Sequence, residues 1–158
     1  MRSRLTRGMT LAAPLILVLV AAGCGSSSKS TSTTPAISKA EFLKKGNAIC
    51  KKGNQQISQA ARKAFPKSKG KPSQAELTKF ATDTIIPSVQ SQINGLKALG
   101  APQGDEAKVN AIVTSAQAAL DKGKKDPTLL TSNKKDPFAK ANKLAKAYGL
   151  TVCGSGGG

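Results

Sequence analysis

The sequence contains no histidine and no tryptophan, and its 158 residues include only eight acids, four phenylalanines and one tyrosine. Histidine is the commonest general base and the commonest metal ligand, so its absence removes both roles. Few aromatic rings are present to stack on nucleic-acid bases. These shortages count against an enzyme, a zinc or iron centre and a nucleic-acid-binding protein.

The few acids do not form a recognisable catalytic set. Most of them fall at expected helix N-termini, where a carboxylate is favoured by the helix dipole; these are Glu41, Glu76, Asp105, Glu106 and Asp136. The other three are too widely spread to suggest the carboxylate pair of a glycosidase. A serine–lysine dyad would need a geometry that abundance alone does not supply. We therefore expect no enzyme activity, no catalytic residue, no metal and no cofactor.

Lysine dominates the charge. Lysine and arginine number 25 against 8 acids; three arginines lie in the first seven residues, so 22 cations and a net charge of +14 remain from residue 24 onward. Arg62 is the only arginine in that part. Lysine suits diffuse contact with anionic surfaces, whereas arginine suits bidentate recognition of phosphates and bases. This balance predicts contact with an anionic lipid, a cell-wall polymer or an envelope protein. A lysine coat that only keeps the domain soluble is the alternative.

The first 24 residues have the pattern of a lipoprotein signal. An apolar stretch of about 14 residues, Met9–Ala22, is the right length for a signal and short for a membrane span. The following Ala21-Ala22-Gly23-Cys24 resembles the lipobox of bacterial lipoproteins, which more often has leucine in place of Ala21. The resemblance implies cleavage after residue 23, acyl chains such as palmitate on Cys24, and a location on the extracytoplasmic face of the cell membrane. An ordinary secretory signal is the alternative.

Cys50 and Cys153 are the two cysteines that remain once Cys24 is lipidated. Thiols of exported proteins oxidise, and only one pairing is possible, so we expect a Cys50–Cys153 disulfide. It would close a loop of about 100 residues and stabilise the domain by up to ~4–5 kcal/mol in the chain-entropy model. A redox-active pair is the weaker alternative, because no Cys-x-x-Cys and no flanking histidine is present.

Composition divides the chain into four parts. Residues 1–23 form the signal, and residues 24–37 form the lipidated N-terminus and a flexible Ser/Thr-rich linker. Residues 38–153 form the folded domain, and residues 154–158 a glycine–serine tail that we expect to be disordered.

Apolar residues at steps of three and four predict an all-α domain that resembles a four-helix bundle. Capping boxes at residues 38–41 and 73–76 start the first two helices, which extend to about residues 65 and 99. The third helix opens at Asp105 and gives way to a polar loop at Gly123. The fourth starts with Asp136-Pro137 and ends at Gly149. Leu129 and Leu130 are expected to dip from the loop into the core.

Two features within these helices bear on packing. Lys44-Lys45-Gly46-Asn47 recurs seven residues later as Lys51-Lys52-Gly53-Asn54, which places both glycines on the buried face. Glycine lowers helix propensity, so we expect a close helix crossing there. A phosphate-binding glycine loop is a poor alternative, because no strand precedes the glycines. Pro87 is expected to kink or break the second helix.

The lysines of this repeat lie about 100° or more from the apolar stripe. A basic loop follows the first helix at residues 66–72. The two sets together are the candidate contacts with an anionic surface: Lys44, Lys45, Lys51, Lys52, Lys67, Lys69 and Lys71.

The end of the domain has a recognisable arrangement of small, aromatic and cysteine residues. Together with Ile49-Cys50 and the proline-containing middle helix, it resembles small secreted or lipid-anchored helical proteins of actinobacterial type over about residues 38–154. The residues concerned are Ala145, Tyr148, Gly149, Leu150, Cys153 and Gly154. The resemblance implies a fold and a location, and it implies no activity.

Two functions remain as hypotheses. The first is a lipid-anchored interaction module that contacts the envelope through its lysines. The second is a carrier of a small ligand or lipid, with an apolar pocket near Gly46, Gly53 and the Pro87 kink. A continuous apolar cavity of at least ~300 Å³ would favour the carrier. The sequence predicts no oligomeric state.

Overall fold

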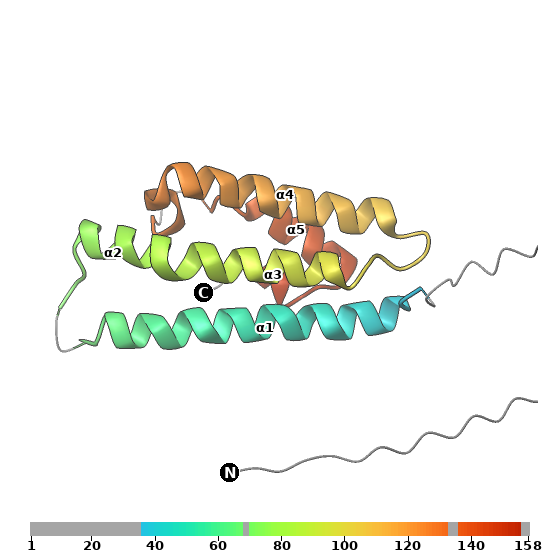
Figure 1. The fold of residues 1–158 in the computed structure, drawn as a ribbon, viewed down its shortest axis with the longest axis horizontal. Coiled ribbons are helices and arrows are strands. Elements are labelled where there is room, and N and C mark those ends of the chain that lie inside the picture. Colours follow the sequence, from blue (N-terminus) through green and yellow to red (C-terminus); the bar gives the residue numbers. More distant parts are fainter. Residues whose placement is uncertain (1–35, 68–69, 133–135, 156–158) are drawn as a thin grey trace, which may run out of the picture. The chain divides into compact units, whose positions relative to one another are not determined.

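The computed structural model describes residues 36–67, 70–132 and 136–155, and in these ranges the chain is helical without a strand. The predicted signal, Cys24, most of the linker, Lys69 and residues 156–158 lie outside the described residues. Figure 1 shows the elements in order. They are α1 (Lys39–Ala64), α2 (Gln74–Phe80), η2 (Ala81–Ile85), α3 (Ile86–Ala98), α4 (Glu106–Lys125), η3 (Pro127–Leu130), α5 (Ala139–Tyr148) and η4 (Cys153–Ser155).

Helix α1 begins and ends close to where the sequence predicts. The Ser38 side chain accepts a hydrogen bond from the Glu41 amide at 3.2 Å, which satisfies one of the free N–H groups of the first turn. The buried residues of α1 are spaced by four or three along one face: Phe42, Gly46, Cys50 and Gly53. The predicted burial of both glycines is confirmed.

The predicted second helix is continuous and comprises α2, η2 and α3. Ser73 and Glu76 form a complete capping box at its start. Pro87 does not break it: the turn just before the proline, η2, is π-helical. Proline has no N–H and its ring clashes with the carbonyl four residues earlier, and a wider turn is one way to relieve that conflict. The helix ends before Gly100, whose φ is 69°.

Helix α4 is longer than the sequence predicts. It continues through Gly123 to Lys125, and Gly123 is buried because the Leu130 side chain packs directly against it. The expectation that Gly123 starts a loop was therefore wrong. Glycine often ends a helix, but here it lies within α4 and leaves space for the Leu130 side chain. Leu129 is 38% exposed and does not enter the core as predicted.

Helix α5 begins at Ala139, two residues later than the predicted first helical residue, Pro137. The Asp136 carboxylate nevertheless acts as a cap, since it accepts hydrogen bonds from the Phe138 amide and from the Asn142 side chain, each at 2.8 Å. The helix ends as expected at Gly149, with φ 107°. The Leu150 amide then donates to the Ala145 carbonyl at 2.9 Å, and Leu150 itself is 1% exposed.

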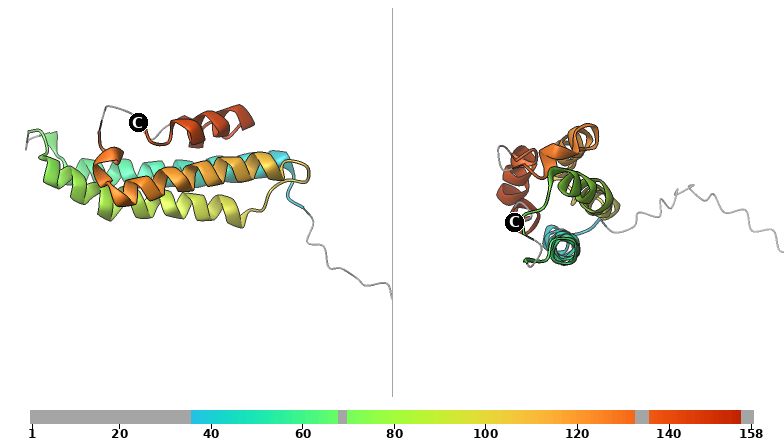
Figure 2. Two further views of the ribbon diagram at one scale, coloured as in Figure 1. Left: turned by 90° about the horizontal axis from the view of Figure 1, so that it is seen from above. Right: turned by 90° about the vertical axis from the view of Figure 1, so that its left-hand side faces the viewer.

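The helices pack in sequence order, α1 on α3, α3 on α4 and α4 on α5, and Figure 2 shows the short α5 beside the longer helices. The C-terminal segment returns from α5 to α1. The sulfur atoms of Cys50 and Cys153 lie 2.04 Å apart, at disulfide distance, which agrees with the predicted pairing. Nearby, the Asn47 side chain donates to the Gly149 carbonyl at 3.2 Å and accepts from the Val152 amide at 2.9 Å.

The C-terminal end of α5, at Tyr148, is held where α1 and α4 begin. The Asp105 carboxylate accepts hydrogen bonds from Lys108 at 2.7 Å and from the Tyr148 hydroxyl at 3.0 Å, and Lys39 lies 3.3 Å away. The Phe42 ring meets Tyr148 edge-on at 6.0 Å. The hydrogen bond from Lys108 is the main cause that lowers the pKa of Asp105 to about 2. The pKa of Tyr148 is raised to about 12, mainly by burial of the hydroxyl and also by its hydrogen bond to Asp105.

We expect Gly46→Ala to lower the free energy of unfolding by about 1–2 kcal/mol. A Cβ at Gly46 would lie 2.7 Å from Leu150 Cδ2 and 3.1 Å from Leu96 Cδ2, and both leucines are buried. Overpacking costs about 1–3 kcal/mol, more than the roughly 1 kcal/mol that alanine gains over glycine in a helix. Urea unfolding measures the change. Gly53→Ala is the control, because the Gln92 side chain that it meets is half-buried and can move away. Equal loss in both variants would contradict this account.

We also expect the domain to lose stability between about pH 4 and pH 2 through Asp105. Its pKa in the folded protein is below its unfolded value of about 3.9, so the ionised form stabilises the fold above that value. This contribution is lost as the pH falls through the folded pKa. Urea midpoints at pH 5 and pH 2.5 should differ less for Asp105→Asn than for the unaltered chain. Glu106→Gln, at the next residue, should leave the difference unchanged; a wild-type response in Asp105→Asn would refute the assignment.

Candidate functional site

The lengths of α1 and α5 determine where the domain is hollow. Helix α1 has 26 residues and α5 has 10, which at 1.5 Å per residue gives lengths of about 39 Å and 15 Å. The C-terminal end of α5 is held beside Phe42, and the segment after it reaches back to Cys50. Helix α5 therefore covers the first half of α1 and leaves the second half without a fourth helix against it.

A cavity of about 510 Å³ lies between the helices, lined by α5 as far as Ala145 and by the second half of α1 as far as Ser58. Residues from α1, η2, α3, α4, η3 and α5 line it. Its apolar wall is formed mainly by branched side chains and one aromatic ring: Ile57, Ile85, Val89, Ile93, Ile112 and Phe138. The volume is above the ~300 Å³ at which a continuous apolar cavity favours ligand binding over a filled helix seam.

The polar wall lies mostly on α1 and on the segments flanking α5. It contains the side chains of Asn54, Ser58, Gln92, Asn142 and Ser155, together with Asp136. Cys50 and Cys153 also line the cavity, so their link forms part of its wall. The site therefore combines a large apolar surface with a few polar groups, the usual composition of a small-molecule pocket.

The polar residues of α1 were not predicted as part of the site. The predicted stripe continues through Ile57 to the alanines at positions 60, 61 and 64. Asn54 and Ser58 follow Cys50 at steps of four, which places them about 40° and 80° around the helix from that buried residue. That spacing is the signal that could have identified them, because a buried face that turns polar marks the place where helix packing ends.

The π-helical turn lies beside the cavity. Ile85 ends this turn and Val89 follows one turn later in α3, and both line the cavity. A π turn takes one more residue per turn than an α-helix, and so it rotates the side chains that follow. The sequence predicts a pocket near Gly46, Gly53 and the Pro87 kink. None of these three residues lines the cavity, although Ile85 and Val89, on either side of Pro87, do.

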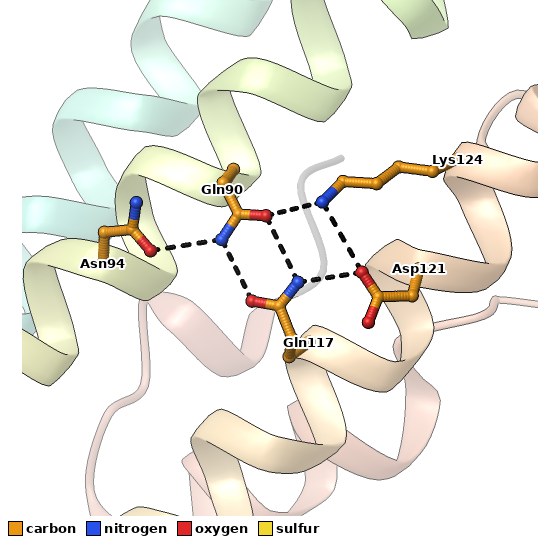
Figure 3. A network of polar contacts seen from close by, with 5 residues as sticks. All are labelled: Gln90, Asn94, Gln117, Asp121 and Lys124. Atoms are coloured by element: carbon orange, nitrogen blue, oxygen red, sulfur yellow. Dashed lines mark hydrogen bonds and ion pairs between the residues drawn. The ribbon is translucent and has the colours of Figure 1, made fainter.

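A second polar group of residues, shown in Figure 3, joins α3 to α4. The side-chain amides of Gln90 and Gln117 exchange hydrogen bonds of 3.0 and 3.2 Å. Lys124 donates to Gln90 Oε1 at 2.8 Å, and Gln117 donates to Asp121 at 2.9 Å. The hydrogen bond from Gln117 is the main cause that lowers the pKa of Asp121. These groups satisfy one another, so the cluster acts as a clamp between two helices, which the sequence did not reveal.

The predicted lysine contacts do not form one patch. Lys44, Lys51 and Lys52 lie exposed on α1, whereas Lys67 and Lys71 lie beyond its end. The 20 residue steps of helix from Lys44 to Ala64 alone span roughly 30 Å, and Lys67 lies beyond that end. Lys45 is paired with Glu41 at 2.6 Å. The structure thus distributes these charges along the domain.

Within the described parts of the chain, no group of three or more histidines, cysteines or acids could hold a metal ion. None of the described helices is long and apolar enough to cross a membrane. Comparisons with protein-family models, curated proteins and solved structures find no match for this chain.

Proposed function

We propose that the helical domain binds a small, largely apolar molecule in the cavity between α1, α3, α4 and α5. The observation that carries this proposal is the cavity of about 510 Å³ with branched apolar side chains on its wall. The cavity is partly open to solvent, so its apolar wall is in contact with water, and covering that wall is favourable. A bound apolar molecule would restore the contacts that the lining side chains lack. The cavity therefore favours the carrier hypothesis over the purely surface-mediated one.

The test is uptake of the uncharged dye N-phenyl-1-naphthylamine by the full chain in lipid nanodiscs. Ala116 lines the cavity and is half-buried, so the larger side chain of Ala116→Leu should fill part of the cavity. After the nanodisc background is subtracted, the dye fluorescence of this variant should be at most half that of the original chain. The same variant should melt a few degrees higher, because it buries more apolar surface.

Ala118→Leu is the matched control, since Ala118 is exposed on the same helix. It should leave dye uptake unchanged. Equal fluorescence from the original chain and Ala116→Leu, at every dye concentration, would remove the support for a binding cavity.

A second proposal concerns location and the lysine surface. We propose that a lipid on Cys24 anchors the chain at the extracytoplasmic face of the cell membrane, as in the lipoproteins that the N-terminal pattern resembles. The 13 residues after Cys24 would form a tether with a reach of roughly 20 Å. Five lysines of the described residues form ion pairs. Lys44, Lys51 and Lys52 have no carboxylate within 4.0 Å in the described part of the chain, so they remain available to anionic lipids or polymers.

The domain from Thr33 onward, which forms one compact unit, should bind vesicles containing phosphatidylglycerol and should not bind vesicles of phosphatidylcholine alone. Binding should fall steeply between 50 and 300 mM salt, since screening shortens the electrostatic range. Lys51→Gln with Lys52→Gln should weaken binding by up to roughly 30-fold, at about 1 kcal/mol for each lysine near the surface. Equal binding to neutral and anionic vesicles would refute the proposed electrostatic contact through the lysines. Lipidation of Cys24 is tested separately, by the mass of the mature chain.

A further inference from the structure

We infer that the cavity selects an uncharged amphiphile, a molecule with an apolar body and a neutral head group that forms hydrogen bonds. This inference rests on the proposed binding function and adds the chemical class of the ligand. Three features of the cavity carry it: the charge of its lining, the unpaired polar groups on one wall, and the position of its most buried residues.

The cavity wall departs from the charge of the rest of the chain. Cations outnumber acids by 22 to 8 from residue 24 onward. Among the described residues that line the cavity, however, none is a lysine or arginine, and Asp136 is the only one with an ionisable side chain besides the paired cysteines. Among the described residues, an anionic head group placed there would meet a carboxylate and no cation, which disfavours fatty acids and anionic lipids.

The position of Asp136 is fixed by its own contacts. One carboxylate oxygen accepts from the Phe138 amide and the other from the Asn142 side chain, both at 2.8 Å. Its side chain is exposed, which places the carboxylate at the edge of the cavity. A cationic head group could approach this carboxylate, but the net positive charge of the domain repels cations over longer distances. The same net charge attracts anions, which the carboxylate repels. For a head group of either sign the two effects therefore oppose each other, and a neutral head group is subject to neither.

Three polar side chains of the wall are free to bind such a head group. Asn54 and Ser58 lie one turn apart on α1, and Gln92 lies opposite on α3. In the described part of the chain none of these three side chains makes a hydrogen bond, and all are half-buried. Amides and hydroxyls both donate and accept, so they can satisfy an alcohol, an amide or an ester without a charge on either partner.

The most buried part of the lining is apolar. Ile93 is 3% exposed, Ile112 is 4% exposed and Leu96 is 6% exposed, and all three belong both to the cavity wall and to the main core. The half-buried Asn54 and Ser58 and the exposed Asp136 lie nearer to solvent. The polarity therefore increases from the core toward the edge, in the order expected for an apolar body inside and a head group outside.

The experiment compares decanol, decanoate and decylammonium, which share one apolar body and differ in the charge of the head group. The full chain in nanodiscs is melted by circular dichroism at 222 nm with each compound, and the shift is taken relative to Ala116→Leu in the same nanodiscs. A ligand that binds only the folded state raises the melting temperature. Decanol should raise it by several degrees, and each charged compound should raise it by less than half as much.

Two substitutions locate the selectivity. Asp136→Asn keeps an acceptor for the Phe138 amide and removes the charge, so it should strengthen decanoate binding about fivefold and leave decanol unchanged. Asp126→Asn is the matched control, because Asp126 caps η3 in a similar way and does not line the cavity. Asn54→Ala with Ser58→Ala should lower the decanol shift by at least half, whereas the exposed Gln55→Ala should not.

The outcomes separate the inference from the function on which it rests. A shift from decanoate or decylammonium equal to or larger than that from decanol overturns the inference, and binding of the naphthylamine dye then still supports the cavity as a binding site. If none of the three compounds shifts the melting temperature, the inference is overturned. If the original chain also takes up no naphthylamine dye, the proposed function is overturned.

Discussion

The placement of α5 along α1 is the constraint on which the rest of the domain depends. One end of α5 is held where Tyr148 meets Phe42 and Asp105. The segment after it is held at the middle of α1 by Asn47 and by the Cys50–Cys153 link. Because both attachments lie in the first half of α1, the short helix covers that half alone. The cavity is therefore a consequence of helix length and of where the second cysteine stands in the chain.

The two walls of the cavity differ in how firmly they are held. Helices α3 and α4 are joined on one side by the Gln90–Gln117 clamp and share the most buried residues of the core. The second half of α1 has no buried residue after Gly53, and α2 has none in its whole length. Elements with few buried contacts open at lower free energy than the core. We therefore expect a ligand to enter between α1 and the start of α5 rather than between α3 and α4.

Much of the fold follows from local sequence signals, which explains what was predicted and what was not. Capping residues such as Ser73, the glycine at the end of α5 and the apolar spacing of α1 act within a few residues, so helix number and most boundaries could be predicted. The pairing of Cys50 with Cys153 followed from elimination. The boundaries that were wrong, at Gly123 and Asp136, depend on a partner elsewhere: Leu130 in the first case and Asn142 in the second.

The candidate site was harder to predict because its polar members resemble surface residues. A polar side chain on a helix usually faces water. Only the packing of α1 against α3 shows that Asn54, Ser58 and Gln92 line the cavity. The π turn and the clamp of Gln90 with Gln117 likewise depend on the contact of two segments. The candidate lysines that the structure describes, in contrast, are exposed as expected, and the length of α1 shows how far apart they lie.

The opposite charge preferences of surface and cavity need not conflict. If the lysines act as proposed, the domain would be drawn toward anionic envelope surfaces, and this attraction would act over roughly a Debye length of 8–10 Å. An uncharged amphiphile partitions into the same membranes through its apolar body and is not affected by that field. A cavity edged by Asp136, with no lysine among its described lining residues, would then avoid the anionic lipids that the outer surface would attract. Surface charge would set where the domain works, and the uncharged, hydrogen-bonding wall of Asn54 and Ser58 would set what it takes up there.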